Sequence, residues 1–144
     1  MTVGTVGTVD PVVLLGAGKM GAAFVDRWAE AGRSVVVWNR GAARAEALAR
    51  DGVVAETSLL EAVRGRRLVV SSVTDGPALV GVMLEGGALD AMDEGALLVD
   101  LSTVDVASSE AVAAAAQERG IRYVRGAVSG SPLVVRGGSA SLLL

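Results

Sequence analysis

A glycine-rich turn between a short apolar run and an alanine-rich segment constrains this chain more than any other feature. The turn has the sequence GAGKMG, from Gly16 to Gly21, and it directly follows the apolar run Val12 to Leu15. The segment after the turn has the amphipathic spacing of a helix as far as Ala31, where Gly32 ends it. The sequence therefore predicts a strand, a tight turn and a helix in immediate succession.

Each glycine of such a turn has its own role in nucleotide binding. Gly16 permits the tight exit from the strand, Gly18 lets the backbone approach a pyrophosphate, and Gly21 lets the helix pack on the sheet. The helix N-terminus offers free N–H groups and a positive dipole end to the phosphates. A second strand, Ser34 to Trp38, ends at the distance of about 20 residues that the dinucleotide fingerprint requires. We expect the turn residues to bind a dinucleotide: Gly16, Ala17, Gly18, Lys19, Met20 and Gly21.

The residues that end the second strand favour NADP(H) over NAD(H). An NAD site places Asp or Glu there to accept a hydrogen bond from the ribose 2′-hydroxyl, but this chain has Asn39 followed by Arg40. A carboxylate would repel a 2′-phosphate, whereas Arg40 offers it a planar cationic fork. Arg44, one helical turn further on, is either a second cation for this phosphate or a solvated surface residue.

The rest of the chain alternates apolar strands with helical segments. Further strands are expected at Val53 to Ala55, Leu68 to Val73, Ala96 to Leu101 and Ile121 to Val124, with helices at Ala42 to Arg50, Leu59 to Arg64, Ala78 to Leu84 and Asp105 to Arg119. Strands that are apolar on both faces indicate a buried parallel sheet. We predict an α/β Rossmann fold, with a doubly wound, mainly parallel sheet and helices on both faces.

The two ends of the chain are expected to differ from this pattern. Residues 1–10 are a short low-complexity lead without a functional signal, and residues 11–144 form the NAD(P)-binding domain. The last ten residues, VRGGSASLLL, suggest a loop and then an apolar strand. That strand is either docked in a complete small protein or cut off before a further domain, and we expect the second.

Composition excludes several functions. A formal charge of −3 and no basic run interleaved with aromatics argue against a nucleic-acid partner. The chain has no cysteine and no histidine, so disulfides, the usual zinc sites and imidazole-dependent triads are excluded, and we predict no metal site. Apolar runs are far shorter than the roughly 20 residues that cross a bilayer, so a cytoplasmic protein without a membrane partner is expected.

Three motifs together resemble the β-hydroxyacid dehydrogenase family, which includes 3-hydroxyisobutyrate dehydrogenase and imine reductase relatives. They are GAGKMG with VWNR downstream (Val37 to Arg40), DLST (Asp100 to Thr103) and VSGS (Val128 to Ser131). The resemblance runs from about Val12 to Leu144. Their joint order and spacing are far more specific than the glycine turn alone.

The resemblance implies roles for three further segments. The loop Val73, Thr74 and Asp75 would pass the cofactor, Ser102 and Thr103 would lie beside the nicotinamide and the substrate, and Ser129 with Gly130 would meet the substrate carboxylate. Two simpler interpretations stay open. Ser102 and Thr103 could cap the helix expected from Asp105, and Ser129-Gly130 could be only a turn.

The resemblance also implies a reaction, reversible hydride transfer between NADP(H) and a short 3-hydroxy acid as the small-molecule substrate. The family's catalytic lysine lies in a second, mostly helical domain beyond Leu144. We therefore assign no catalytic residue to this chain, expect the isolated chain to be inactive, and expect a homodimer where the second domain is present. The alternatives are the cofactor domain of an imine reductase and a stand-alone NADP-binding or sensor module without catalysis.

One three-residue segment and one further residue depart from the family pattern. Arg125-Gly126-Ala127 stands where the family usually has Asp-Ala-Pro, which changes the backbone beside the substrate carboxylate. Gly41 stands where NADP members commonly carry a Ser or Thr that binds the 2′-phosphate. The second departure weakens the expected affinity for NADP(H) more than the preference for it.

Overall fold

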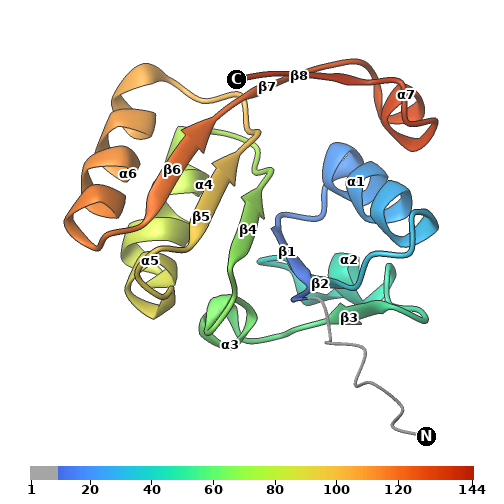
Figure 1. Ribbon diagram of the computed structural model, residues 1–144, viewed down its shortest axis with the longest axis horizontal. Coiled ribbons are helices and arrows are strands. Elements are labelled where there is room, and N and C mark those ends of the chain that lie inside the picture. The colour runs from blue at the N-terminus through green and yellow to red at the C-terminus, as the bar shows by residue number, and fades with distance from the viewer. Residues whose placement is uncertain (1–9) are drawn as a thin grey trace, which may run out of the picture.

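A six-stranded parallel sheet forms the centre of the protein in the computed structural model, which describes residues 10–144 (Figure 1). The strands have the order β3-β2-β1-β4-β5-β6, and every neighbouring pair is parallel. Their bounds are β1 Val12–Leu15, β2 Val35–Trp38, β3 Val53–Ala55, β4 Leu68–Ser71, β5 Leu97–Asp100 and β6 Arg122–Arg125. The order reverses between β1 and β4, as in a doubly wound Rossmann sheet. The predicted fold class is confirmed.

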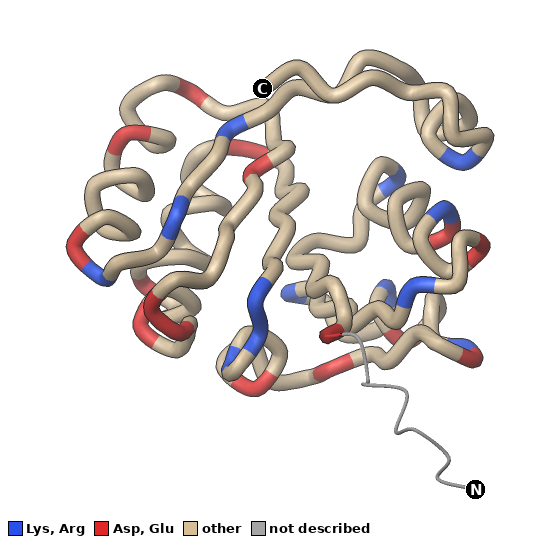
Figure 2. Tube along the Cα trace, in the orientation of Figure 1, with Lys and Arg blue, Asp and Glu red and all other residues tan. Residues whose placement is uncertain are grey.

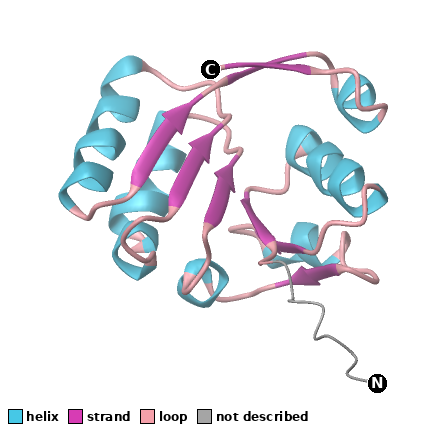
Figure 3. Ribbon diagram, viewed as in Figure 1, coloured by secondary structure: helices cyan, strands magenta, loops and turns pink. Residues whose placement is uncertain are grey.

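Helices cover both faces of the sheet (Figure 3). The helical elements are α1 Lys19–Glu30, α2 Ala42–Glu46, α3 Leu59–Val63, α4 Gly76–Val80, the π-helical turn η1 Gly81–Glu85, α5 Ala88–Ala91, α6 Val106–Glu118 and α7 Pro132–Arg136. Val12 and Leu14 of β1 belong to the core under α1, α2 and α7, whereas Val13 and Leu15 belong to the core under α3 to α6. All four are buried, which explains why this strand is apolar without alternation.

Several boundaries differ from the expected ones. The helix expected from Ala42 to Arg50 ends at Glu46, because Ala47 to Arg50 form turns before the Asp51-Gly52 break. The helix expected from Ala78 begins at Gly76, where Asp75 caps it. It continues into η1, and α5 lies between the expected helix and strand, where no element was predicted. No helix within residues 10–144 has both the length and the apolar content needed to cross a bilayer.

The chain after β6 adds a ribbon and a helix to one side of the domain. Strands β7 (Ala127–Ser129) and β8 (Ser141–Leu143) pair antiparallel, and α7 between them packs on α1 (Figure 1). The terminal strand was expected, but β7 was not. The expected loop was wrong at its start, because Val135 and Arg136 belong to α7. Val135 is buried against the α1 side of the core, so tertiary packing stabilises this five-residue helix.

The contact between α1 and α7 contains a shared ion pair. The Asp26 carboxylate accepts a hydrogen bond from Arg136 Nε at 2.7 Å and another from Arg50 Nη2 at 2.7 Å. Partial burial acts to raise the pKa of the Asp26 carboxyl, but the hydrogen bonds from Arg136 and Arg50 outweigh it and leave the pKa below its ordinary value. One carboxylate therefore connects α1 to α7 and to the turn before β3.

Replacing this carboxylate should destabilise the domain in a pH-dependent way. Asp26→Asn removes both ion pairs, and we expect it to lower the free energy of unfolding at pH 7 by about 1 kcal/mol, since both pairs are partly exposed. Because the folded pKa is lowered, this stabilisation is present above the unfolded value near 3.9 and is lost as the pH falls through the folded pKa.

Urea unfolding at pH 7 and at progressively lower pH measures the effect. The difference between wild type and Asp26→Asn should shrink in acid. Asp93→Asn is the matched control, because Asp93 is exposed and has no ion pair within residues 10–144. A difference that stays constant down to the acid limit would show that Asp26 does not act through its charge.

Candidate functional site

The three glycines of the turn between β1 and α1 lie in three different environments. Gly16 has φ +107°, and a Cβ there would overlap the carbonyl oxygen of Ser72. A Cβ on Gly21 would overlap the carbonyl oxygen of Gly16. A Cβ on Gly18 would meet no atom within 4 Å. Gly16 and Gly21 are thus required for packing, whereas Gly18 leaves its backbone open to a ligand.

The N-terminus of α1 is free to bind an anion. Its N-cap is Gly18, and no side chain accepts a hydrogen bond from the first turn of this 12-residue helix. Four other helices (α3, α4, α6 and α7) have a Ser or Asp N-cap whose side chain accepts such a bond. The unused N–H groups and the helix dipole therefore favour a phosphate group beside Gly18.

Asn39 connects the end of β2 to the glycine turn. Its Oδ1 accepts a hydrogen bond from the backbone N–H of Ala17 at 2.8 Å, and its Nδ2 donates one to the carbonyl oxygen of Gly41 at 2.9 Å. An amide can do both, whereas a carboxylate has no proton to donate. The neutral residue noted in the sequence thus also holds together the two loops at this edge of the sheet.

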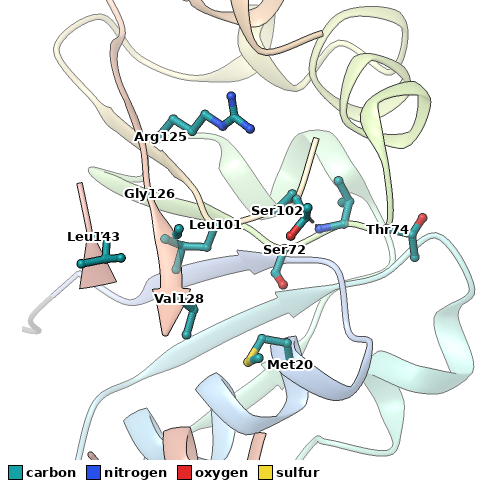
Figure 4. A pocket seen from close by; sticks show the side chains of 12 residues that line it. Met20, Ser72, Thr74, Leu101, Ser102, Arg125, Gly126, Val128 and Leu143 are labelled. Atoms are coloured by element: carbon teal, nitrogen blue, oxygen red, sulfur yellow. Dashed lines mark hydrogen bonds between the residues drawn. The ribbon is translucent and has the colours of Figure 1, made fainter. Parts of the chain in front are cut away.

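A cavity of about 520 Å³ opens at the carboxyl ends of β1, β4, β5 and β6 (Figure 4). Five residues expected to bind cofactor or substrate line it: Met20, Val73, Thr74, Ser102 and Thr103. The rest of its wall consists of Ser72, Leu101, Arg125, Gly126, Ala127, Val128 and Leu143. The sequence predicted ligands at this edge, where a doubly wound sheet binds them.

Ser102 joins the two loops that line this cavity. Its Oγ accepts a hydrogen bond from the backbone N–H of Val73 at 2.8 Å, and its own N–H donates to Asp100 Oδ1 at 3.1 Å. The fully buried Asp100 also accepts a bond from Ser71 Oγ at 2.8 Å. Ser102 therefore does not cap α6, and that alternative is wrong for Thr103 as well, because the N-cap is Asp105.

Other predicted residues lie outside the cavity wall. The Asp75 carboxylate accepts a hydrogen bond from the N–H of Ala78 and caps α4. Ser129 ends β7, and Gly130 follows it with φ +143°, a conformation that favours glycine. Contact of Asp75 with the cofactor, and of Ser129 and Gly130 with the substrate, stays a prediction.

A second hollow, of about 420 Å³, lies beside the glycine turn between α1, α2 and α7. Its uncharged wall consists of Ala17, Gly18, Ala22, Leu48 and Pro132. Its charged residues are Lys19, Arg44 and Arg136, all of them basic. Figure 2 shows basic positions on the facing parts of α1 and α7. Arg40 lies outside both hollows with an exposed side chain.

Sequence reasoning missed Arg136 as a site residue. Its place beside Lys19 depends on the packing of α7 against α1, which no local pattern in the sequence predicts. The Arg136 guanidinium also donates a hydrogen bond to Asp26 of α1, and this bond fixes the side chain against α1. Arg44 lines the same hollow, and its role as a second cation for the phosphate stays a prediction.

The described part of the cavity wall contains no group suited to proton transfer. The one tyrosine, Tyr123, lies outside the wall and shares a hydrogen bond of 3.0 Å with Ser109 Oγ. Burial raises the pKa of the Tyr123 hydroxyl, the hydrogen bond to Ser109 opposes this, and nearby Asp100 raises the pKa further.

Within residues 10–144 no three His, Cys, Asp or Glu side chains are grouped as metal ligands.

Comparison with known proteins places this geometry in a family. The model of the NAD-binding domain of 6-phosphogluconate dehydrogenase matches residues 11–144. The chain belongs to this family. It is an NAD(P)-binding domain of the kind found in β-hydroxyacid dehydrogenases and imine reductases, in agreement with the resemblance seen in its motifs.

Relatives with similar sequences include a plant reductase and an animal nuclear factor. The chain is 32% identical over 133 residues to glyoxylate/succinic semialdehyde reductase 1 of Arabidopsis thaliana, covering 92% of this chain and 46% of that protein. It is 29% identical over 130 residues to the cytokine-like nuclear factor N-PAC of Homo sapiens, covering 90% of this chain and 24% of that protein. The NAD(P)-binding domain thus spans half or less of the length of these relatives.

Solved structures of the family superimpose on most of the domain. The 3-hydroxyisobutyrate dehydrogenase of Mycobacterium tuberculosis with L-serine has a TM-score of 0.85 at 25% identity, covering 93% of this chain and 45% of that one. The imine reductase of Myxococcus stipitatus in complex with NADP+ has a TM-score of 0.78 at 27% identity, covering 86% and 43%. A structure of the V8 variant of the same imine reductase is in complex with NAD+.

The glycine environments predict opposite effects of two similar substitutions. Gly18→Ala adds a methyl group in open space, so we expect the free energy of unfolding to fall by about 1 kcal/mol or less while NADPH binding is lost. Gly16→Ala combines positive φ with overlap on Ser72, so we expect a loss of about 3 kcal/mol or more. Urea unfolding and fluorescence titration with NADPH measure the two properties. Unimpaired NADPH binding by a folded Gly18→Ala variant would contradict this interpretation of the turn.

Proposed function

We propose that this chain is the cofactor domain of an NADP(H)-dependent oxidoreductase that transfers hydride to or from a short 3-hydroxy acid. The observation that carries the proposal is the cavity at the carboxyl ends of the strands. It extends from Met20 beside the glycine turn to the hydroxyl groups of Ser102 and Thr103. A dinucleotide on the turn can thus present one end to a small substrate within a single space. Family membership supports the same function.

The residues of the domain fit the cofactor in distinct ways. The open backbone at Gly18 and the uncapped N-terminus of α1 suit the pyrophosphate. Val73 and Thr74 form the wall over which the nicotinamide end would pass. The bound nicotinamide supplies or accepts the hydride, and the protein orients it against the substrate.

Polar and apolar groups share the wall around the reaction site. The hydroxyl groups of Ser102 and Thr103 can orient the oxygen of the substrate by hydrogen bonding. Leu101, Val128 and Leu143 contribute apolar surface that excludes water. Such a combination of apolar surface with convergent polar groups is typical of sites for small ligands.

Three features favour NADP(H) as the cofactor. The charged residues of the hollow beside the glycine turn are all basic. Two of them, Lys19 and Arg44, form no ion pair within residues 10–144, whereas Arg136 is paired with Asp26. Asn39 keeps the end of β2 free of the carboxylate that an NAD site would use. Arg40 is exposed and has no ion pair within residues 10–144, so its guanidinium is available to a phosphate.

Fluorescence titration of the chain with NADPH and NADH tests the cofactor preference. We expect tighter binding of NADPH, and a rise of about tenfold in its dissociation constant in Arg44→Ala, with little change for NADH. Arg67→Ala is the matched control, because Arg67 precedes β4 and so lies at the opposite edge of the sheet. Equal or tighter binding of NADH by the wild type would contradict the preference.

A charge reversal at the neighbouring arginine gives an independent test. Arg40→Asp places at this position the carboxylate that repels a 2′-phosphate, so the variant should lose its preference for NADPH. Its unfolding free energy should stay close to that of the wild type, because the side chain is exposed. Unchanged selectivity in the same titration would show that this guanidinium is not at the phosphate.

Proton transfer is proposed to depend on a lysine from a second, mostly helical domain. The described cavity wall has no carboxylate, lysine or tyrosine to act as the acid. We therefore expect the 144-residue chain with NADPH and succinic semialdehyde to bind the cofactor without oxidising it. Absorbance at the NADPH band measures this, and steady NADPH consumption would show that the chain supplies its own acid.

Two alternatives are supported by particular relatives. The similarity to the imine reductase of Myxococcus stipitatus favours the cofactor domain of an imine reductase. The similarity to N-PAC, which is named as a nuclear factor, favours a binding module without catalysis. A coding sequence that continues past Leu144 into a lysine-bearing helix would establish an enzyme and exclude the module.

A further inference from the structure

Arg125 is the one ionisable residue among those that line the cavity at the carboxyl ends of the strands. The other polar side chains of the wall are four hydroxyl groups, on Ser72, Thr74, Ser102 and Thr103. Hydroxyl groups can donate to or accept from a ligand of either sign. A single guanidinium among them gives the described wall a net positive charge, which favours an anionic ligand.

The guanidinium of Arg125 keeps most of its hydrogen-bonding capacity. Within residues 10–144 it makes one hydrogen bond, from Nη2 to the carbonyl oxygen of Val104 at 2.6 Å. This bond fixes the side chain against the loop that follows β5. An arginine has five N–H donors, so the rest of the fork has no partner in the described part of the chain.

Two carboxylates lie near Arg125 in the fold, but neither forms an ion pair with it, although, besides the hydrogen bonds from Ser108, the charge of Arg125 contributes to lowering the pKa of the Asp105 carboxyl. Asp100 is its register partner across β5 and β6, but it is fully buried and its Oδ1 accepts from Ser71 and Ser102. Asp105 is exposed and accepts two hydrogen bonds from Ser108. Neither approaches Arg125 within the 4 Å of an ion pair.

Arg125 also lies at the end of the cavity away from the cofactor turn. In Figure 4, Arg125 and Met20 are at opposite ends, with Leu101 and Ser102 between them. Met20 belongs to the first turn of α1, next to the place where the pyrophosphate would bind. A phosphate bound at the glycine turn would therefore lie away from Arg125, and an anion at Arg125 would have to come from a second ligand.

We infer that Arg125 determines substrate specificity by binding the carboxylate of a short hydroxy or oxo acid, an inference that rests on the proposed function. Arg125 thereby takes the role that the family resemblance implied for Ser129 and Gly130, which lie outside the cavity wall. The planar fork of arginine matches a carboxylate through two parallel hydrogen bonds, which gives both affinity and orientation. With the acid anchored there, its hydroxyl or carbonyl group is directed toward Ser102 and Thr103. A cationic iminium substrate would instead be repelled, so the same residue disfavours an imine reductase.

Binding of a matched acid and amide to the chain tests this inference. The probes are 3-hydroxypropanoate and its neutral analogue 3-hydroxypropanamide, titrated into the 15N-labelled chain saturated with NADPH and followed by amide NMR shifts. We expect the acid to shift the resonances of Ser102, Thr103 and Gly126, and the amide to bind at least about tenfold more weakly.

Variants of two arginines on the same strand separate local recognition from general charge. Arg125→Gln should weaken binding of the acid by about tenfold or more, and Arg125→Lys should restore part of it, because lysine keeps the charge but not the fork. Arg122→Gln is the control. Arg122 lies at the other end of β6, and its guanidinium also donates to a backbone carbonyl, that of Gly95. We expect Arg122→Gln to bind the acid like the wild type.

The NADPH titration distinguishes the two proposals. If the wild type does not bind NADPH, the proposed function fails and the inference fails with it. If every variant binds NADPH but Arg125→Gln retains wild-type affinity for the acid, the inference alone is overturned. It is also overturned if the amide binds as tightly as the acid, if Arg122→Gln weakens the acid equally, or if the acid shifts no resonance even at its highest soluble concentration.

Discussion

Close backbone contact at Gly16 is the constraint on which the rest of the structure depends. At this point the exit of β1, the loop after β4 and the first turn of α1 meet with no side chain between them. A Cβ on Gly16 would overlap the Ser72 carbonyl, and one on Gly21 would overlap the Gly16 carbonyl. Because these three segments touch, the open backbone of Gly18 and the wall formed by Val73 and Thr74 belong to one continuous surface. Cofactor binding at the turn and substrate binding in the cavity thus depend on the same packing.

Much of the fold could be predicted because its signals are local. The glycine turn, the apolar strands and the long amphipathic helix α1 all have patterns that short windows of sequence contain. The elements that were missed depend on tertiary contacts. Helix α7 has only five residues, and two of them are the β-branched Val134 and Val135. Its packing on α1 and the Arg136–Asp26 ion pair stabilise it as a helix. The short α5 likewise lacks a sequence signal of its own. The π-helical turn η1 overlaps the helix expected from Ala78 to Leu84, and only its π-helical geometry was not predicted.

The residues of the candidate site also fall into those that local motifs predict and those that only tertiary contacts bring together. Residues of the motifs, such as Ser102 and Thr103, were expected at the carboxyl edge of the sheet and line the cavity there. Arg125 was visible only as a departure from the family pattern, because its role depends on which charges surround it in space. Arg136 gave no signal at all, since the hollow that it lines forms between helices more than 100 residues apart in the chain, as its 110-residue separation from Asp26 shows. Chemistry that arises from non-local proximity is what sequence patterns leave out.

The double hydrogen bond of Asn39 has a consequence for redesign of the cofactor preference. A common way to favour NAD over NADP is to place an aspartate after the second strand. At position 39, however, such a carboxylate would keep the bond from the Ala17 N–H but turn an oxygen toward the Gly41 carbonyl, where the amide now donates. The aspartate would discriminate between a ribose 2′-hydroxyl and a 2′-phosphate, but it would also weaken the loop after β2 by removing the hydrogen bond to Gly41. Selectivity and rigidity are coupled through one side chain here, so a change of cofactor is better introduced at the neighbouring exposed positions than at Asn39 itself.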